Sequence, residues 1–184
     1  MLTHGAGSDC RSPLLAAVAR AFAQEGLAVL RCDLPFRQAR PHGPPAPGDA
    51  TRDRAGLLAA TAALRAVAPG RLFLGGHSYG GRQASMLVVE DPGAASGLLL
   101  LSYPLHPPRR PGQTRTAHFP RLRIPALFVH GARDPFGSPE EMRAALALIP
   151  ALAELLLLPG GHHLPSLAAA PAGITAAFRS LMGV

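Results

Sequence analysis

The sequence predicts a single α/β domain over residues 1–184, with a mainly parallel β-sheet and helices on both faces. Short apolar runs of strand length alternate along the chain with longer amphipathic segments. Most of these runs contain no polar residue, which is typical of strands that are covered on both faces of a parallel sheet. We therefore expect about six parallel strands, close to the usual size of such sheets.

The expected strands define the sheet. A very short strand precedes the loop that begins at His4, so the N-terminal strands are expected to be reduced or missing. Five apolar runs form the rest of the sheet: Val29–Cys32, Leu72–Gly75, Leu98–Ser102, Ala126–His130 and Leu155–Leu158.

Capping signals place the helices between these strands. Ser12 caps a helix that has Pro13 at its first position, and Gly26 follows its end. Ser138 and Pro139 open another helix in the same way. The other helices are a segment capped by Asp49 that runs to about Ala68, a segment that follows Tyr79, and a segment over about Leu167–Met182.

Two irregular segments, Leu34–Gly48 and Tyr103–Arg123, are rich in proline and arginine. Each leaves the carboxyl end of an expected strand, which is where open α/β sheets bind ligands. They are either ordinary variable loops or part of the substrate-binding surface.

Composition excludes several classes of function. The chain is 48% apolar and 16% charged, which indicates a globular protein. Its 18 basic side chains are all arginines, and they are scattered, so the net charge of +7 does not predict a nucleic-acid-binding face. No apolar stretch is long enough to span a membrane, and no signal peptide is visible. We expect a cytoplasmic protein with reduced cysteines.

The most informative motif is Gly76-His-Ser-Tyr-Gly80, which has the pattern G-x-S-x-G. It follows an apolar run and precedes a helical segment, as a serine nucleophile on a tight strand-to-helix turn requires. Small residues are needed on both sides of the serine because the backbone passes close by. Ser78 is therefore the candidate nucleophile; a glycine-rich turn with a capping serine is the alternative.

A serine nucleophile needs a base, and the base needs an acid that orients it. Asp134 follows the strand that ends at His130, where a carboxylate can orient an imidazole. Two adjacent histidines follow the last strand, and we expect His163 to be the base, with His162 as the alternative. The sequence contains no cluster of further ligands at zinc spacing, so no metal is expected.

Acyl transfer also needs two backbone N–H groups that point at the developing oxyanion. One is expected from Tyr79, the residue after the nucleophile, and the other from Ala6, with Gly5 as the near alternative. His4 is expected to brace the loop that carries Ala6.

Together these motifs resemble the α/β-hydrolase superfamily, and more closely its small dienelactone-hydrolase-like branch, which includes relatives of a subunit of the mammalian nonspecific-lethal chromatin complex. The resemblance covers nearly the whole chain and rests on five blocks: His4–Gly7, Arg31–Phe36, Gly75–Arg82, His130–Gly137 and Gly160–His163. In that branch the last block commonly reads G-x-D-H with the base at its final residue, which favours His163. Phe36 and Tyr103 are expected to contact the substrate. Arg82 is expected to contact it too, through an anionic group; the alternative is that Arg82 only anchors the helix.

The resemblance and the motifs imply a serine hydrolase that cleaves a small ester or thioester through an acyl-enzyme, without a cofactor. The partner is then a small-molecule acyl substrate, with no nucleic acid and no membrane involved. A non-enzymatic protein-interaction module on the same scaffold and an acyltransferase are the alternatives. The oligomeric state is left open.

Overall fold

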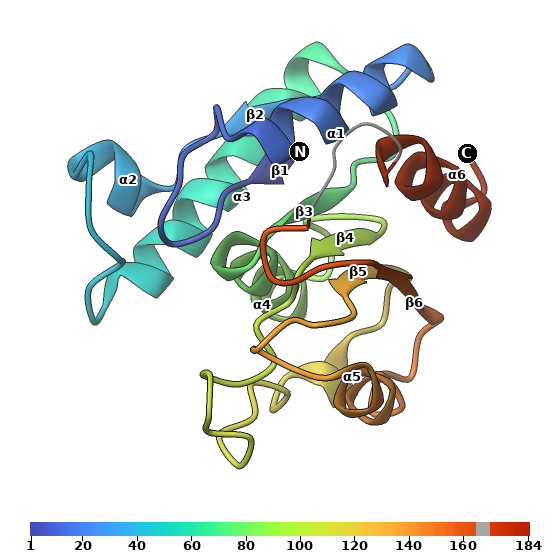
Figure 1. Ribbon diagram of the computed structural model, residues 1–184. Helices are drawn as coiled ribbons and strands as arrows, with labels where there is room; N and C mark the ends of the chain where they lie inside the picture. The colour runs from blue at the N-terminus through green and yellow to red at the C-terminus, as the bar shows by residue number, and fades with distance from the viewer. Residues whose placement is uncertain (165–169) are drawn as a thin grey trace.

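The computed structural model describes residues 1–164 and 170–184. Its centre is a six-stranded sheet in which every neighbouring pair is parallel, with the order β2-β1-β3-β4-β5-β6 (Figure 1). The α/β class and the parallel sheet predicted from the sequence are confirmed. The strands are β1 (Leu2–Thr3), β2 (Arg31–Cys32), β3 (Leu74–His77), β4 (Leu98–Leu101), β5 (Ala126–Gly131) and β6 (Ala153–Leu158).

Helices cover both faces of the sheet. On one face α1 packs beside α6, where Phe22 and Phe178 meet edge to face (Figure 1). On the other face α3, α4 and α5 bury Leu57, Leu87 and Met142 in a separate hydrophobic cluster. The helices are α1 (Pro13–Gln24), α2 (Pro35–Ala39), α3 (Asp49–Val67), α4 (Tyr79–Glu90), α5 (Pro139–Leu146) and α6 (Ala170–Met182), with a 3₁₀ turn at Phe119–Arg121.

The alternation of side chains along the central strands explains this two-sided core. Leu98 and Leu100 of β4 belong to the cluster under α3, α4 and α5, whereas Leu99 and Leu101 belong to the cluster under α1 and α6. Successive residues of a strand point to opposite faces, so an uninterrupted leucine run fills both layers at once. The four strands β3 to β6 are thereby held rigidly between the helices.

Local sequence signals account for most helix boundaries. Ser12 accepts a hydrogen bond from the Leu15 amide, and Ser138 forms a complete capping box with Glu141. Asp49 was expected to be a cap, but it is the first residue of α3; Gly48, with φ of 89°, holds the cap position. Asp49 instead accepts a 2.6 Å hydrogen bond from the Ala46 amide, which still stabilises the start of the helix.

One expectation differs from the structure, and another falls partly outside the described residues. The irregular segments each contain a short helical turn, α2 in the first and the 3₁₀ turn in the second, and a turn this short leaves little periodicity in a proline-rich sequence. The last helix is observed from Ala170 to Met182, and its expected start at residues 167–169 lies outside the described residues.

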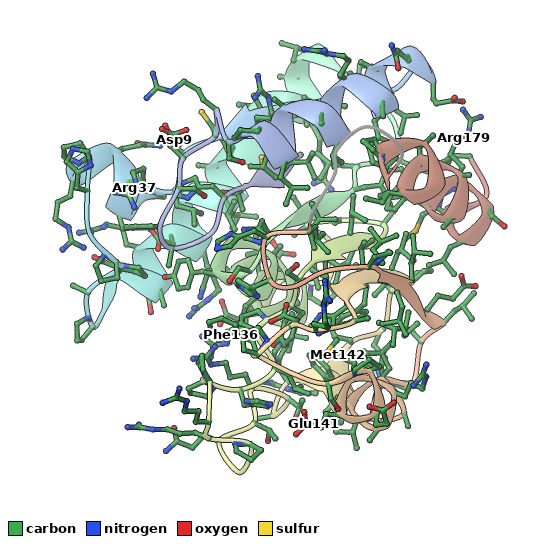
Figure 2. All side chains as sticks on the ribbon, viewed as in Figure 1. Asp9, Arg37, Phe136, Glu141, Met142 and Arg179 are labelled. Atoms are coloured by element: carbon green, nitrogen blue, oxygen red, sulfur yellow. The ribbon has the colours of Figure 1, made fainter. Side chains whose placement is uncertain are left out.

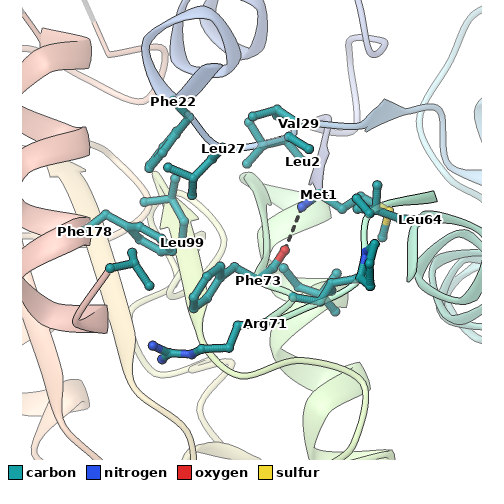
Figure 3. A pocket seen from close by; sticks show the side chains of 16 residues that line it. Met1, Leu2, Phe22, Leu27, Val29, Leu64, Arg71, Phe73, Leu99 and Phe178 are labelled. Atoms are coloured by element: carbon teal, nitrogen blue, oxygen red, sulfur yellow. Dashed lines mark hydrogen bonds between the residues drawn. The ribbon is translucent and has the colours of Figure 1, made fainter. Parts of the chain in front are cut away.

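The two ends of the parallel strands differ: an apolar cavity lies at the amino end, and the chemically active side chains lie at the carboxyl end. At the amino end of the strands, the Met1 amino group donates a 2.7 Å hydrogen bond to the Phe73 carbonyl beside an apolar cavity of about 270 Å³ (Figure 3). Its walls include Phe22 and Phe178, from the helix pair on one face. The chemically active side chains lie at the opposite, carboxyl edge of the same strands.

Candidate active site

Ser78 lies in the tight turn between β3 and α4. Its φ of 50° and ψ of −115° are unusual for a residue with a side chain, and its amide donates a 2.8 Å hydrogen bond to the Leu101 carbonyl. A Cβ atom at Gly76 would lie 2.5 Å from the Thr3 carbonyl oxygen, and one at Gly80 would lie 2.5 Å from the His4 carbonyl oxygen. The two glycines of the motif are therefore required by the loop after β1, which passes directly beside the turn.

Three side chains from three segments form one hydrogen-bonded chain at this edge. His162 Nε2 is 2.8 Å from Ser78 Oγ, and His162 Nδ1 is 2.8 Å from Asp134 Oδ2. Because a carboxylate can only accept, Nδ1 carries the proton and Nε2 is free to accept the hydrogen of the serine hydroxyl. This is the arrangement of a nucleophile, its base and the acid that orients the base.

The structure corrects the expected histidine. His162, and not His163, meets Ser78 and Asp134, whereas His163 is exposed. The amide of Leu164 bonds to the Gly161 carbonyl and closes a turn in which adjacent side chains point in different directions. His77 reaches across from β3, and its Nε2 donates a 2.9 Å hydrogen bond to the His162 carbonyl. This bond fixes the turn so that His162 faces the serine.

Further contacts hold the acid and the base in place. Phe136, in the loop between β5 and α5 (Figure 2), packs its ring 4.1 Å from the His162 ring, centroid to centroid. The Phe136 amide also donates a 2.9 Å hydrogen bond to Asp134 Oδ1. The Asp134 side chain is fully buried. Its two oxygens are bonded to the Phe136 amide and to His162 Nδ1, so neither depends on water. His130 donates from Nε2 to the Gly137 carbonyl at 2.8 Å and closes the same loop.

The expected oxyanion-binding groups are arranged around the same serine. Tyr79 is the first residue of α4, and its amide has no intrahelical acceptor. The loop after β1 lies beside it, since a Cβ atom at Gly5 would be 3.5 Å from Ser78 Cβ. Within the part of the chain that is described, the amides of Ala6 and Tyr79 donate no hydrogen bond. Neither of these two N–H groups is therefore used by the described protein, as the expected role would require.

His4 and Arg37 brace the loop that carries Ala6. The buried His4 ring donates from Nδ1 to the Gly5 carbonyl at 2.8 Å and accepts from the Leu34 amide at 3.1 Å, and burial lowers its pKa. This agrees with the bracing role expected for His4. Arg37 of α2 (Figure 2) donates to the carbonyls of Ala6 at 2.8 Å and Ser8 at 3.0 Å. Sequence reasoning missed Arg37 because it lies in a segment read as irregular.

A buried carboxylate holds the residue after the nucleophile. Asp53 of α3 is fully buried and accepts a 2.8 Å hydrogen bond from the Tyr79 hydroxyl and a 2.9 Å hydrogen bond from the Phe36 amide. Burial, with the neighbouring Asp53, raises the pKa of Tyr79, so the phenol keeps its proton and acts as the donor. Asp53 was not singled out from the sequence, because an aspartate inside an amphipathic helix normally faces water.

The residues expected to contact substrate have different positions. Phe36 is fully buried and packs edge to face on the Tyr79 ring. Tyr103 is also buried, and its hydroxyl donates to the Arg115 carbonyl at 2.7 Å. Neither ring faces solvent, so contact of Phe36 or Tyr103 with a substrate stays a prediction. Arg82 is partly exposed and lies one helical turn after Ser78.

The fold and this edge of the sheet together define the α/β-hydrolase class, in which a serine, an acid and a histidine follow in that order along the chain. The chain belongs to the alpha/beta hydrolase family, because the family's domain model matches residues 1–171.

Solved structures agree on the fold. Est1E from Butyrivibrio proteoclasticus, determined with ferulic acid bound, has a TM-score of 0.76 at 17% identity and matches 100% of this chain and 88% of its own. An alpha/beta-superfamily hydrolase from Xanthomonas campestris, described as putative, has a TM-score of 0.67 at 24% identity, over 99% and 96%. Dienelactone hydrolase from Anabaena variabilis has a TM-score of 0.70 at 23% identity, over 99% and 82%.

Residues 1–164 and 170–184 contain no group of three or more histidine, cysteine or acidic side chains that could hold a metal ion. In the same ranges, no helix has the length and apolar character needed to cross a membrane.

Proposed function

We propose that this protein is a serine hydrolase of small esters or thioesters, with Ser78 as the nucleophile, His162 as the base and Asp134 as the acid that orients it. The observation that carries the proposal is the pair of 2.8 Å contacts that His162 makes with Ser78 and Asp134. A hydroxyl is a weak nucleophile, and this geometry supplies the base that activates it.

In the first half of the reaction, Ser78 Oγ attacks the acyl carbon while its proton moves to His162 Nε2. The negative charge that develops on the carbonyl oxygen is bound by the free amides of Ala6 and Tyr79. The tetrahedral intermediate then collapses, and the proton on Nε2 passes to the departing alcohol or thiol. The acyl group remains on Ser78 as an ester. Asp134 stabilises the imidazolium throughout without itself taking the proton.

In the second half, water replaces the departed group and His162 takes one of its protons. The resulting hydroxide attacks the acyl-enzyme, the same two amides bind the oxyanion, and the proton returns to Ser78 Oγ as the acid is released. An alcohol or amine in place of water would make the protein an acyltransferase by the same chemistry. No cofactor takes part in any of these steps.

Two features support a small acyl group. No large insertion separates β4 from β5, and the segment between them carries its own hydrogen bonds: the Tyr103 hydroxyl donates to the Arg115 carbonyl at 2.7 Å, and the Arg115 side chain donates to the Pro104 carbonyl at 3.2 Å. A short segment with its own internal bonds, in place of a large cap, supports a small acyl substrate.

The test is covalent labelling with a fluorophosphonate, in which Ser78 Oγ forms a bond to phosphorus and fluoride leaves. Intact mass should show one adduct on the wild-type protein and none on Ser78→Ala. Heat-denatured wild type is the control, because an unassembled site should not react. A folded wild type that resists the probe would contradict the proposal and favour an interaction module on the same scaffold.

A further inference from the structure

Arg82 lies one helical turn from the nucleophile and has no counter-ion. Its amide bonds to the Ser78 carbonyl at 3.0 Å. The Arg82 charge opposes the rise in the pKa of Tyr79 and of Tyr103, so the guanidinium lies near both rings, one of which belongs to the residue after the nucleophile. Its Nε atom is buried and has no hydrogen-bond partner among the described residues. No described carboxylate oxygen lies within 4.0 Å of the guanidinium nitrogens, and the remaining residues 165–169 contain no acid.

Two other arginines near the site have hydrogen-bond partners. Arg54, on the neighbouring α3, pairs with Glu90 at 2.7 Å, and Arg37 donates to backbone carbonyls of the loop it braces. A buried guanidinium N–H without an acceptor is costly, more so because the group is charged. The described residues therefore provide no acceptor for the Nε–H group of Arg82.

Arg82 lies near other basic side chains, whereas the carboxylate of Asp53 beside Tyr79 is already bonded to the Tyr79 hydroxyl and the Phe36 amide. Burial lowers the pKa of Arg115, and the charge of Arg82 lowers it further. Burial also lowers the pKa of His118 to about 4, with the charges of Arg82 and Arg121 acting in the same direction. The neutral His118 ring is tied to Ser85 Oγ at 2.9 Å. The cluster thus presents an excess of positive charge that an anion would balance.

A second unused donor flanks the nucleophile. Ser102 directly follows Leu101, whose carbonyl accepts the Ser78 amide, and the Ser102 amide donates to the Val129 carbonyl at 2.8 Å. Ser102 has a φ of 49°, and its hydroxyl is buried without a partner in the described part of the chain. A non-glycine residue in this left-handed region is strained, and such strain is typical of functional sites.

We propose that Arg82, with Ser102, forms a subsite for a carboxylate carried by the substrate, so that the preferred substrates are half-esters of small dicarboxylic acids. The inference rests on the proposed serine hydrolase function and names its substrate class. A guanidinium binds a carboxylate through two parallel hydrogen bonds, which would satisfy Nε and place the ester at the neighbouring Ser78. The anion would also balance the charge that Arg82 and Arg115 impose on each other.

The kinetic test compares two substrates of equal length, mono-4-nitrophenyl adipate and 4-nitrophenyl hexanoate, which differ by a terminal carboxylate in place of a methyl group. The wild-type kcat/KM should favour the adipate by about tenfold or more. Arg82→Gln should abolish this preference, mostly through KM, and Arg82→Lys should retain part of it. Arg143→Gln, which removes an exposed arginine on α5, is the matched control and should keep the wild-type ratio. An unchanged ratio in Arg82→Gln would overturn the proposal.

A binding measurement separates failure of this inference from failure of the hydrolase proposal. Adipate should raise the thermal unfolding midpoint of Ser78→Ala, which cannot turn over, and should not raise that of Ser78→Ala/Arg82→Gln. Stabilisation by inorganic phosphate but not by adipate would overturn the carboxylate assignment. Hydrolysis of the hexanoate without any adipate preference would leave the hydrolase intact and contradict the subsite alone.

Discussion

The Tyr79 hydroxyl donates a 2.8 Å hydrogen bond to Asp53 Oδ2, which ties the residue after the nucleophile to a carboxylate inside α3. The bond matters because Tyr79 contributes its amide to the proposed oxyanion hole. Asp53 is fully buried and its other oxygen accepts the Phe36 amide, so three segments meet at this one side chain.

Replacing Tyr79 with phenylalanine should destabilise the protein by about 1–3 kcal/mol, because it leaves one oxygen of a buried carboxylate without a donor. The amide of residue 79 remains, so kcat for a short 4-nitrophenyl ester should fall less than tenfold. Urea unfolding and steady-state kinetics check both statements. Asp53→Ala removes the acceptor for two donors and should cost more than Tyr79→Phe; an equal or smaller cost would contradict the role given to Asp53.

The two adjacent histidines make a matched pair of variants. His162→Ala should lower kcat by at least about 10³-fold and abolish fluorophosphonate labelling, because the base is lost. His163→Ala removes an exposed ring one residue away and should keep activity within about threefold of wild type. Loss of labelling in His163→Ala with retention in His162→Ala would show that the turn is placed differently from the structure.

Arg37 is expected to act on catalysis without touching the substrate. Arg37→Met should lower kcat by about 10²-fold while KM changes little, because the loop with Ala6 loses its anchors and one oxyanion donor is displaced. Steady-state kinetics measures the split between kcat and KM. Arg11→Met, at a side chain that is 85% exposed, is the control. A rise in KM alone would assign Arg37 to substrate binding instead.

Stability should fall as the pH falls below neutrality. Burial lowers the pKa of both His77 and His118 to about 4 in the folded protein, against about 6.5 in an unfolded chain. Between these values the unfolded chain binds more protons than the folded one, so acid favours unfolding. Each histidine should cost about 2 kcal/mol between pH 7.5 and pH 5.0, as urea unfolding at the two pH values would show.

The variant His118→Gln removes the titration of His118 and leaves that of His77. His118→Gln keeps a polar side chain next to Ser85 but removes the ring, so its unfolding free energy should depend less steeply on pH than that of the wild type. His42→Gln, which removes an exposed imidazole, serves as the control. Equal pH dependence in His118→Gln and wild type would contradict the prediction.

The sequence was sufficient for the fold and for two of the three positions proposed for catalysis. Apolar runs and capping serines are local signals, and they located the central strands and the helices that begin after Ser12 and Ser138. Ser78 was visible because its glycine neighbours are a steric requirement of the turn, and Asp134 because the carboxyl end of a strand is where the acid belongs.

The errors arose where position depends on contacts between distant segments. Choosing between His162 and His163 requires the direction of each side chain in a four-residue turn, which His77 and Phe136 determine from elsewhere in the chain. Asp53 and Arg37 gave no local signal for their roles, since the partners that define those roles, in α2, at Tyr79 and in the loop after β1, are 17 to 31 residues away.

The proposed site draws on segments near residues 4–6, 78–79, 134 and 162, which β1, β3, β5 and β6 carry to one edge of the sheet. No fragment of the chain holds all of them, so nucleophilicity at Ser78 exists only while the whole sheet is intact. Reactivity toward a fluorophosphonate should consequently disappear in urea along the same curve as the helical circular dichroism signal. The reactive serine would then serve as a built-in reporter of cooperative folding, without any added label.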